Sequence, residues 1–231
     1  IICCSDQSIN EHIHLGYKNK FKLIFNGFDN KKFFESDSLR KKLRNKYKII
    51  NECFVIGRIC RWHHQKDFNT LFKSIRSFKQ KHKVNFKLVL AGRDINYKNQ
   101  EIIDLLNKYE LTKNSILMDE LKDTNSFFNF IDLHLSTSQY GEGFPNVIAE
   151  SMLTNTYCIA TNVGDTKIII NNYGDLVKIK DYNEISNIVY SSYKEFIYKK
   201  NINNNEMRTY IINNFSINKM LEEYKKTWRN T

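Results

Sequence analysis

The feature that most restricts the fold is an alternation, from Glu52 onward, of short apolar runs with amphipathic segments. The run CFVIGRIC at 53–60 predicts a strand, and DFNTLFKSIRSFKQKH at 67–82 predicts a helix with apolar residues at helical spacing. FKLVLAG at 86–92 and NQEIIDLLNKY at 99–109 repeat this pair. Because parallel strands need a crossover between them, usually a helix, the order is typical of a parallel sheet covered on both faces.

The alternation continues through the middle of the chain. It runs through SILM, DTNSFFNFI, DLHLS, PNVIAESML and YCIAT, ending at Thr161. Five strands linked by helices predict an α/β fold with a doubly wound, Rossmann-like parallel sheet. DLVKI at 175–179 is a further short apolar segment, and only helical patterns follow it, at 181–200, 204–215 and 216–230. We therefore expect a C-terminal helical tail.

The first 50 residues follow a different pattern. IICCS at 1–5 resembles the end of a strand, SINEHIHLGY at 8–17 predicts a helix, and FKLIFNGFD at 21–29 predicts a strand that enters an Asn-Gly turn. No basic region precedes the short apolar start, which argues against a signal peptide. Since no Met opens the chain, we expect it to begin inside a longer natural protein.

Composition restricts the partners and the compartment. Lys and Arg outnumber Asp and Glu by 36 to 25, and the net charge of +11 favours anionic partners: nucleic acid, phosphorylated metabolites or an acidic membrane surface. The alternative, that the Lys-rich segments are only solvated faces, stays open. The five cysteines show neither CxxC spacing nor pairing with His at metal-ligand intervals, which favours a reduced, cytoplasmic protein.

The stretch GEGFPNVIAES at 141–151 places two carboxylates, Glu142 and Glu150, around the only proline of the chain. Pro145 suits the first position of a helix, where its missing N–H costs nothing. The amides that follow would then point out of a helix N-terminus, which attracts anions. Glu150 lies about one and a half turns further on, so we expect its carboxylate to reach back to the same crevice.

Cations come from a second loop, CRWHHQKDF, which follows the strand at 53–60. Arg61 and Lys66 lie five residues apart in it. Loops at the carboxyl ends of parallel strands meet at one edge of the sheet, where ligands bind. Each of these charges alone would be an ordinary surface group, but together they suit a ligand with both phosphate and hydroxyl groups. A nucleoside diphosphate linked to a sugar has that combination.

These motifs together resemble the family 4 retaining glycosyltransferases of the GT-B fold. EGFPNVIAE matches that family's two Glu residues with seven residues between them, and SMLTNTYCIATNVGD is similar to the helix, strand and Val-Gly loop that follow. RWHHQKDFNTLFKSI resembles the phosphate-binding loop and its helix. SDQSINEHIHLGYKNKFKLIFNGFDNKKF resembles the crossing between two domains, so the likeness spans about residues 1–190. Cys60 stands where Gly usually precedes the Arg.

The resemblance implies a role for each matching position. Arg61 and Lys66 would hold the donor diphosphate, Glu142 would lie near the transferred sugar, and Glu150 would bind the ribose. The backbone that contacts sugar and phosphate would be that of Gly143, Phe144, Asn146 and Val147. In this family such cations and amides stabilise the leaving diphosphate in place of a metal, so no metal cofactor is expected.

The resemblance also implies three parts. Residues 1–28 would be the end of an N-terminal acceptor domain and the interdomain crossing, 29–190 the donor-binding domain, and 191–231 a helical tail. The chain would be mainly the donor half of a hexosyltransferase that moves a sugar from a nucleotide-diphosphate sugar, expected to be UDP-linked. The acceptor would be a glycan or a lipid-linked molecule in cell-surface polysaccharide synthesis. With acceptor residues missing, we expect the isolated chain to bind donor but to transfer poorly.

Two other classes of function use the same features differently. A non-catalytic nucleotide-sugar-binding module would keep the same pocket, so the sequence does not separate it from an enzyme. A nucleic-acid binder would need a reader motif, and neither RNP-like nor helix-turn-helix spacing is present. Under the enzyme interpretation, the Lys-rich segments 31–48 and 194–200 are a hypothetical contact with anionic lipid, which would place the protein peripherally at the inner face of the membrane.

Overall fold

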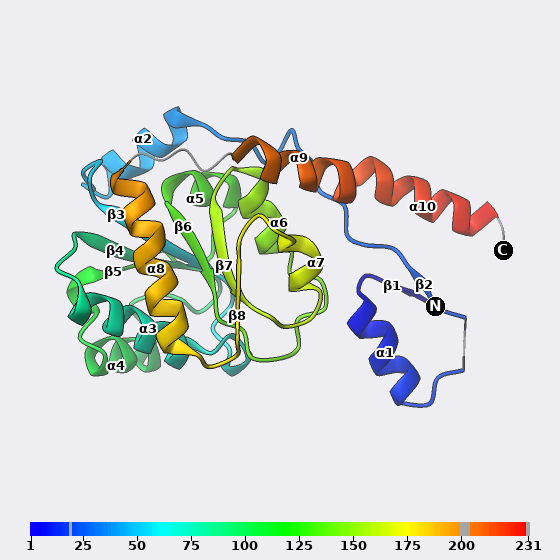
Figure 1. Cartoon of the computed structure of the whole chain (residues 1–231), viewed down its shortest axis with the longest axis horizontal. Helices are drawn as coiled ribbons and strands as arrows, with labels where there is room; N and C mark the ends of the chain where they lie inside the picture. The colour runs from blue at the N-terminus through cyan, green and yellow to red at the C-terminus, as the bar shows by residue number, and fades with distance from the viewer. Residues whose placement is uncertain (19, 199–203, 230–231) are drawn as a thin grey trace.

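A parallel β-sheet with helices on both faces forms the body of the protein, and a small N-terminal unit lies beside it (Figure 1). The computed structural model describes residues 1–18, 20–198 and 204–229. Within these residues the large sheet has six strands in the order β5-β4-β3-β6-β7-β8, with every neighbouring pair parallel. The strands are β3 (Phe54–Ile59), β4 (Phe86–Ala91), β5 (Ser115–Leu117), β6 (Leu133–Ser136), β7 (Tyr157–Thr161) and β8 (Asp175–Val177).

This is the doubly wound, Rossmann-like sheet that the alternation predicts, and all five predicted strands are confirmed. The expected number of strands was one too low, because DLVKI supplies the edge strand β8, which pairs with residues 159–161 of β7. Three residues on an edge carry too little apolar pattern to be distinguished from a loop. Chain order reverses between β3 and β6, which lie side by side in the middle of the sheet.

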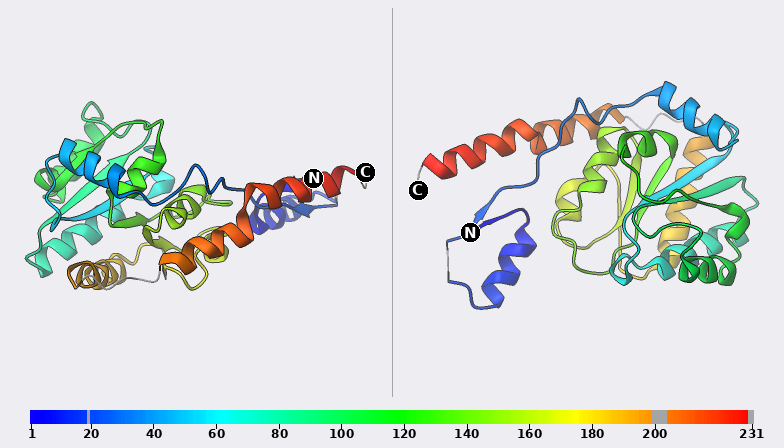
Figure 2. Two further views of the ribbon diagram at one scale, coloured as in Figure 1. Left: turned by 90° about the horizontal axis from the view of Figure 1, so that it is seen from above. Right: turned by 180° about the vertical axis from the view of Figure 1, so that it is seen from behind.

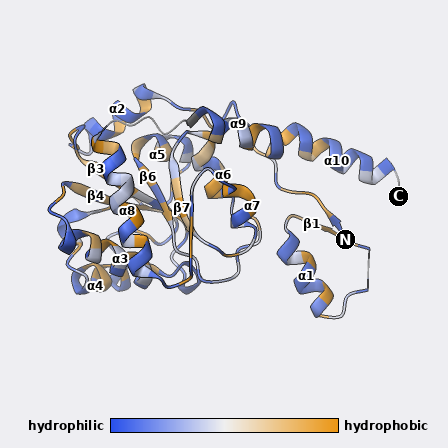
Figure 3. Ribbon diagram, in the orientation of Figure 1, coloured by the Kyte–Doolittle hydropathy of each residue, from blue (hydrophilic) through white to orange (hydrophobic). Residues whose placement is uncertain are grey.

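The helices divide between the two faces of the sheet according to the alternation of side chains along the strands. On one face the core joins Phe54 and Ile56 to apolar side chains of α3 (Phe68–Lys81), α4 (Gln100–Lys108) and α8 (Tyr182–Ile197). On the other face Val55 packs with residues of α5 (Thr124–Phe130) and α2 (Asp37–Lys46). β7 lies between these two layers of helices, and its orange colour in Figure 3 marks hydrophobic residues.

Further elements complete this second face. A second core cluster there is built around Cys158 and Ala160 of β7. It joins α6 (Asn146–Leu153), α7 (Thr166–Ile170) and α9 (Asn204–Phe215). Of two short 3₁₀ turns, η1 (His64–Lys66) follows β3 along the chain and η2 (Thr112–Asn114) precedes β5.

The helical tail runs away from the sheet. α9 packs against α6, and α10 (Ile217–Arg229) continues almost in line with it, as both views in Figure 2 show. α8, in contrast, packs on α3, and residues 199–200 of its predicted C-terminal end lie outside the described residues. The proposed division at 28 and 190 stays a prediction. Among the described residues no helix is long and apolar enough to cross a membrane.

The N-terminal unit contains β1 (Ile2–Cys3), α1 (Asp6–His14) and β2 (Lys22–Leu23), with the two strands parallel. The predicted strand at 21–29 is therefore shortened to two residues. Beyond it the chain crosses to the sheet domain, touching the start of α10, where a bridge joins Phe28 to Ser216. No helix was predicted at the position of α2. Its signals were the N-cap Ser36 and apolar residues four apart, Leu39 and Leu43, within a Lys-rich segment.

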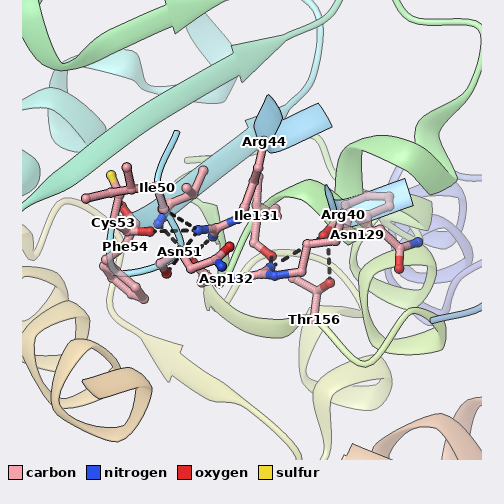
Figure 4. Close-up of polar contacts among 12 residues, drawn as sticks. Arg40, Arg44, Ile50, Asn51, Cys53, Phe54, Asn129, Ile131, Asp132 and Thr156 are labelled. Carbon is pink, nitrogen blue, oxygen red and sulfur yellow. Dashed lines mark hydrogen bonds and ion pairs between the residues drawn. The ribbon is translucent and has the colours of Figure 1, made fainter. Parts of the chain in front are cut away.

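A buried ion-pair cluster joins α2, β3 and β6 at the amino ends of the strands (Figure 4). The Asp132 carboxylate, just before β6, accepts from Val55 N and from Arg44 Nη2, both at 2.7 Å, and also pairs with Arg40. Arg44 is 1% exposed, and its Nη1 donates to the carbonyl oxygens of Ile50, Asn51 and Cys53 at 3.1 to 3.2 Å. One carboxylate thus fixes a helix and two strands together.

Replacing Asp132 by Ala leaves two guanidinium groups without their acid partner, one of them buried, so we expect the free energy of unfolding to fall by about 3–5 kcal/mol. Urea unfolding followed by circular dichroism measures this. Glu223→Ala is the matched control, because Glu223 also binds two cations, Lys22 and Lys226, but at the surface. We expect that control to leave the unfolding free energy nearly unchanged. Equal losses in both variants would contradict a special role for the buried cluster.

Candidate functional site

The carboxyl ends of β3 and β6 carry the two loops that the sequence singles out. Because the connections from these neighbouring strands leave in opposite directions, a crevice opens between the loops, the usual ligand position in such sheets. A cavity of about 460 Å³ lies there. Six of the eight predicted site residues line it: Arg61, Lys66, Glu142, Phe144, Asn146 and Val147. The structure therefore brings the two loops to one place, as predicted.

Lys66 and Glu142 meet across the cavity as an ion pair. Glu142 Oε1 also accepts from Ser138 Oγ at 2.6 Å, and Gln65 Nε2 donates to the carbonyl oxygen of Gly141 at 2.8 Å. Both ion-pair side chains are about 15% exposed, so the pair is only partly shielded from water. An incoming anion would have to draw Lys66 away from Glu142. Neither Gln65 nor Ser138 was singled out from the sequence, because their roles arise only where the loops meet.

A buried arginine sets the backbone of the cationic loop. Arg58, 1% exposed on β3, donates Nη2 to the Lys66 carbonyl oxygen at 2.6 Å and Nη1 to Thr137 Oγ1 at 2.7 Å. Thr137 Oγ1 in turn donates to the Asp67 carbonyl oxygen at 3.0 Å. The Arg58 guanidinium lies over the ring of Phe68, 5.3 Å from its centroid. The position of Lys66 thus follows from the strands themselves.

The N-terminus of α6 opens into the same cavity. Pro145 is the residue that caps this helix, with ψ of 94°, and Asn146 is its first helical residue. The prediction that Pro145 begins the helix was wrong by one position, because its extended ψ places it before the first helical turn. No side-chain cap hydrogen bond is found for α6 within the described part of the chain. The first amides of a helix have no partner inside it, so they are available to an anion.

Glu150 does not line this cavity. It lies on α6, where its Oε2 accepts from Thr124 Oγ1 of α5 at 3.4 Å. Burial raises the pKa of the Glu150 carboxyl, while Lys32 and Thr124 act in the opposite direction. Glu150 lies five residues after Pro145, and five residues turn a helix by about 140° more than one full turn. The Glu150 side chain therefore points to the side of α6 and not toward Lys66. Its role as a ribose ligand stays a prediction.

Phe144 and Gly143 are packed against other parts of the chain. The Phe144 ring is 6% exposed and packs against Phe25, Phe28 and Phe215, with centroids 5.2, 6.2 and 5.3 Å away. Gly143 faces the N-terminal unit and is outside the cavity lining. The Phe144 ring therefore holds this loop against neighbouring aromatic residues, and Gly143 leaves room for Ser5 beside it. Backbone contact with a donor at these two positions stays a prediction.

Cations from one loop and the N-terminus of α6 from the next meet at the reversal point of a parallel sheet, so the fold is an α/β domain with a cavity suited to an anion. Comparison with known proteins identifies the family of this domain. The family model of glycosyl transferases group 1 matches residues 39–214, and the chain belongs to this family. The expected family and its GT-B fold are thereby confirmed.

Individual relatives agree with this membership. Over 147 residues the chain is 30% identical to an uncharacterized glycosyltransferase of Methanocaldococcus jannaschii, which covers 63% of this chain and 34% of that protein. This chain superposes with a TM-score of 0.89 on the Anabaena protein HepE in complex with UDP-glucose, at 21% identity, and the match covers 100% of this chain and 63% of HepE. For sucrose-phosphate synthase from Thermosynechococcus elongatus the TM-score is 0.85 at 18% identity, and the match covers 99% of this chain and 57% of the synthase. The two structural matches show a shared fold, and the chain spans less than two thirds of each of these proteins.

The Lys66–Glu142 pair generates a prediction about anion binding. Glu142→Gln removes the internal competitor for Lys66 and one negative charge from the cavity, so pyrophosphate should bind about 5- to 30-fold more tightly, equivalent to about 1–2 kcal/mol. Isothermal titration calorimetry with pyrophosphate measures this. Glu222→Gln on α10 makes the same change of net charge away from the cavity and should leave the affinity unchanged. Weaker or equal binding by the Glu142 variant would show that Glu142 does not compete for Lys66.

Proposed function

We propose that this chain binds the donor of a glycosyltransferase, a nucleoside diphosphate sugar with UDP as its nucleotide. The observation that carries the proposal is the meeting of Arg61, Lys66 and the N-terminus of α6 around one cavity. Two cations and a set of free amides match a diphosphate in charge and in hydrogen-bonding capacity. HepE, which has the same fold, was solved with UDP-glucose, and this supports the choice of nucleotide.

The ion pair in the cavity suggests how donor binding is coupled to placement of the sugar. When a diphosphate takes Lys66, the carboxylate of Glu142 loses that partner and becomes free to accept hydrogen bonds from hydroxyl groups. Glu142 keeps the Ser138 hydrogen bond, which holds its Oε1 at the cavity. The sugar of the donor would supply those hydroxyls next to the diphosphate. We therefore assign Lys66 to the diphosphate and Glu142 to the transferred sugar.

The proposed reaction is transfer of the sugar with retention at its anomeric carbon. The bond between that carbon and the β-phosphate oxygen breaks, and negative charge develops on the leaving diphosphate. A hydroxyl oxygen of the acceptor forms the new bond to that carbon on the same face of the sugar, and the hydroxyl proton passes to the leaving phosphate oxygen. Arg61, Lys66, Asn146 and Val147 line one cavity, which supports a role for the two cations and the two amides in stabilising that charge without a metal. Glu150 is proposed to bind the ribose.

The affinity of this 231-residue chain for UDP tests the proposal. Lys66→Ala should weaken UDP binding by about 1.5–3 kcal/mol, roughly 10- to 150-fold, because a charge-assisted hydrogen bond is lost. Arg61→Ala should act in the same direction. Lys113→Ala removes an exposed lysine next to the amino end of β5, at the opposite edge of the sheet, and should leave the affinity unchanged. Titration calorimetry that finds equal affinity in the Lys66 variant would remove Lys66 from the site.

The acceptor and the catalytic competence of the chain are proposed from the family resemblance. We propose a glycan or lipid-linked acceptor in cell-surface polysaccharide synthesis. Release of UDP from UDP-glucose in the presence of acceptor separates the enzyme from a non-catalytic binding module. Efficient transfer by these 231 residues alone would contradict the expectation that acceptor residues are missing.

Contact with anionic lipid is a further part of the proposal, supported by the net charge of +11. The Lys-rich segment 31–48 includes α2, whose Lys41 and Lys42 are exposed. Of the second segment, 194–200, residues 199–200 lie outside the described part of the chain. Co-sedimentation with vesicles containing phosphatidylserine should be strong at low salt and weak at high salt. Binding that does not depend on salt, or no binding, would remove the membrane from the list of partners.

A further inference from the structure

The loop after β7 holds an aspartate that caps a helix far from it in sequence. Asp165 is 4% exposed and directly precedes α7, yet its carboxylate makes no cap hydrogen bond to that helix. Its Oδ2 instead accepts from Asp6 N at 2.9 Å, and its Oδ1 from Gln7 N at 3.4 Å, at the start of α1. Asp165 therefore fastens the N-terminal unit to the sheet domain.

The same loop lies directly against the backbone of the proposed sugar-binding residues. The amide of Asp165 donates to the carbonyl oxygen of Gly143 at 2.9 Å. Gly164 has φ of +60°, and a Cβ at this position would collide with the carbonyl oxygen of Glu142. On the opposite side, a Cβ added to Gly143 would come within 3.1 Å of Ser5 Oγ, the N-cap of α1. Gly143 is thus held between the loop after β7 and the start of α1.

Residues 141–147, which lead from β6 into α6, are called the donor loop below. The chain that follows α1 contacts this loop at the positions after Gly143. The rings of Phe25 and Phe28 pack on Phe144, and Asn26 Nδ2 donates to Asn146 Oδ1 at 2.9 Å. Residues 1–28 therefore contact the donor loop at positions 143, 144 and 146. Lys66 is held by a separate set of bonds, through Arg58. Gly143 and Lys66, at the proposed sugar and diphosphate ends of the cavity, consequently depend on different supports.

We propose that Asp165 is a positioning residue: by holding the start of α1 against Gly143, it fixes the Glu142–Gly143 peptide where the sugar of the donor binds. This inference rests on the proposed function. It predicts that losing the carboxylate affects the sugar part of the donor and spares the diphosphate part. A residue that only stabilised the fold would weaken both parts together.

Asp165→Ala tests the proposal in two measurements. Hydrogen exchange of residues 6–10 in the free protein should become about tenfold faster, since the helix loses a cap. Titration calorimetry should show UDP-glucose binding about tenfold weaker, the effect of losing a hydrogen bond worth about 1.4 kcal/mol. UDP alone should bind within about twofold of the wild type, because the Asp165 carboxylate bonds Asp6 N and Gln7 N and not Lys66 or the first amides of α6.

Two further variants keep the test decisive. Asp165→Asn retains one acceptor oxygen, so it should give intermediate exchange in α1 and recover part of the UDP-glucose affinity, and it serves if the Ala variant folds poorly. Asp181→Ala removes the carboxylate that caps α8 through Glu184 N, at 2.9 Å, and should change neither measurement. If the wild type binds neither ligand, the proposed function fails. If the wild type binds both and Asp165→Ala weakens them equally or not at all, the positioning role is overturned.

Discussion

The site depends on the parallel pairing of β3 with β6, because this pairing sets the carboxyl ends of the two strands, and the loops that follow them, side by side. That pairing comprises only Ile56 with Leu133 and Gly57 with His134. Gly57 allows the side chain of Ile131 to lie directly on the strand, where a Cβ would collide with it. Such a short pairing needs support at both ends. Asp132 supplies it at the amino ends, and Arg58 with Thr137 supplies it at the carboxyl ends.

The two supports differ in chemistry because they face different surroundings. At the amino ends a carboxylate is shared by two guanidinium groups and one backbone amide, so its charge is fully compensated by the protein. At the carboxyl ends Arg58 is satisfied by neutral oxygen acceptors and by Cys60 Sγ. The positive charge of Arg58 therefore adds to that of Lys66 and Arg61 near the cavity. This difference leaves the amino ends of the strands with a compensated ion-pair cluster and the carboxyl ends with a group of cations beside the cavity.

Particular residues show where sequence reasoning succeeds and where it stops. Strand and helix positions from β3 to β7 were predictable because each apolar run is long enough to display its period. The positions of Arg61 and Lys66 in the cavity were predictable because loops at the carboxyl ends of parallel strands meet at one edge of the sheet. The direction of Glu150 was not predictable in this way, since it depends on the angle at which α6 leaves Pro145. β8 and α2 were missed because a three-residue edge and a Lys-rich helix show little apolar periodicity.

The sequence by itself determined the parallel α/β architecture, the family and the identity of the charged groups at the strand ends, since these follow from local periodicity and from residues close together in the chain. Only the tertiary structure decided that Lys66 pairs with Glu142, 76 residues away, and that Asp165 caps a helix 159 residues earlier. Such partners are chosen by how strands and loops pack. Packing sums many weak contacts between distant segments, and no local pattern records its outcome.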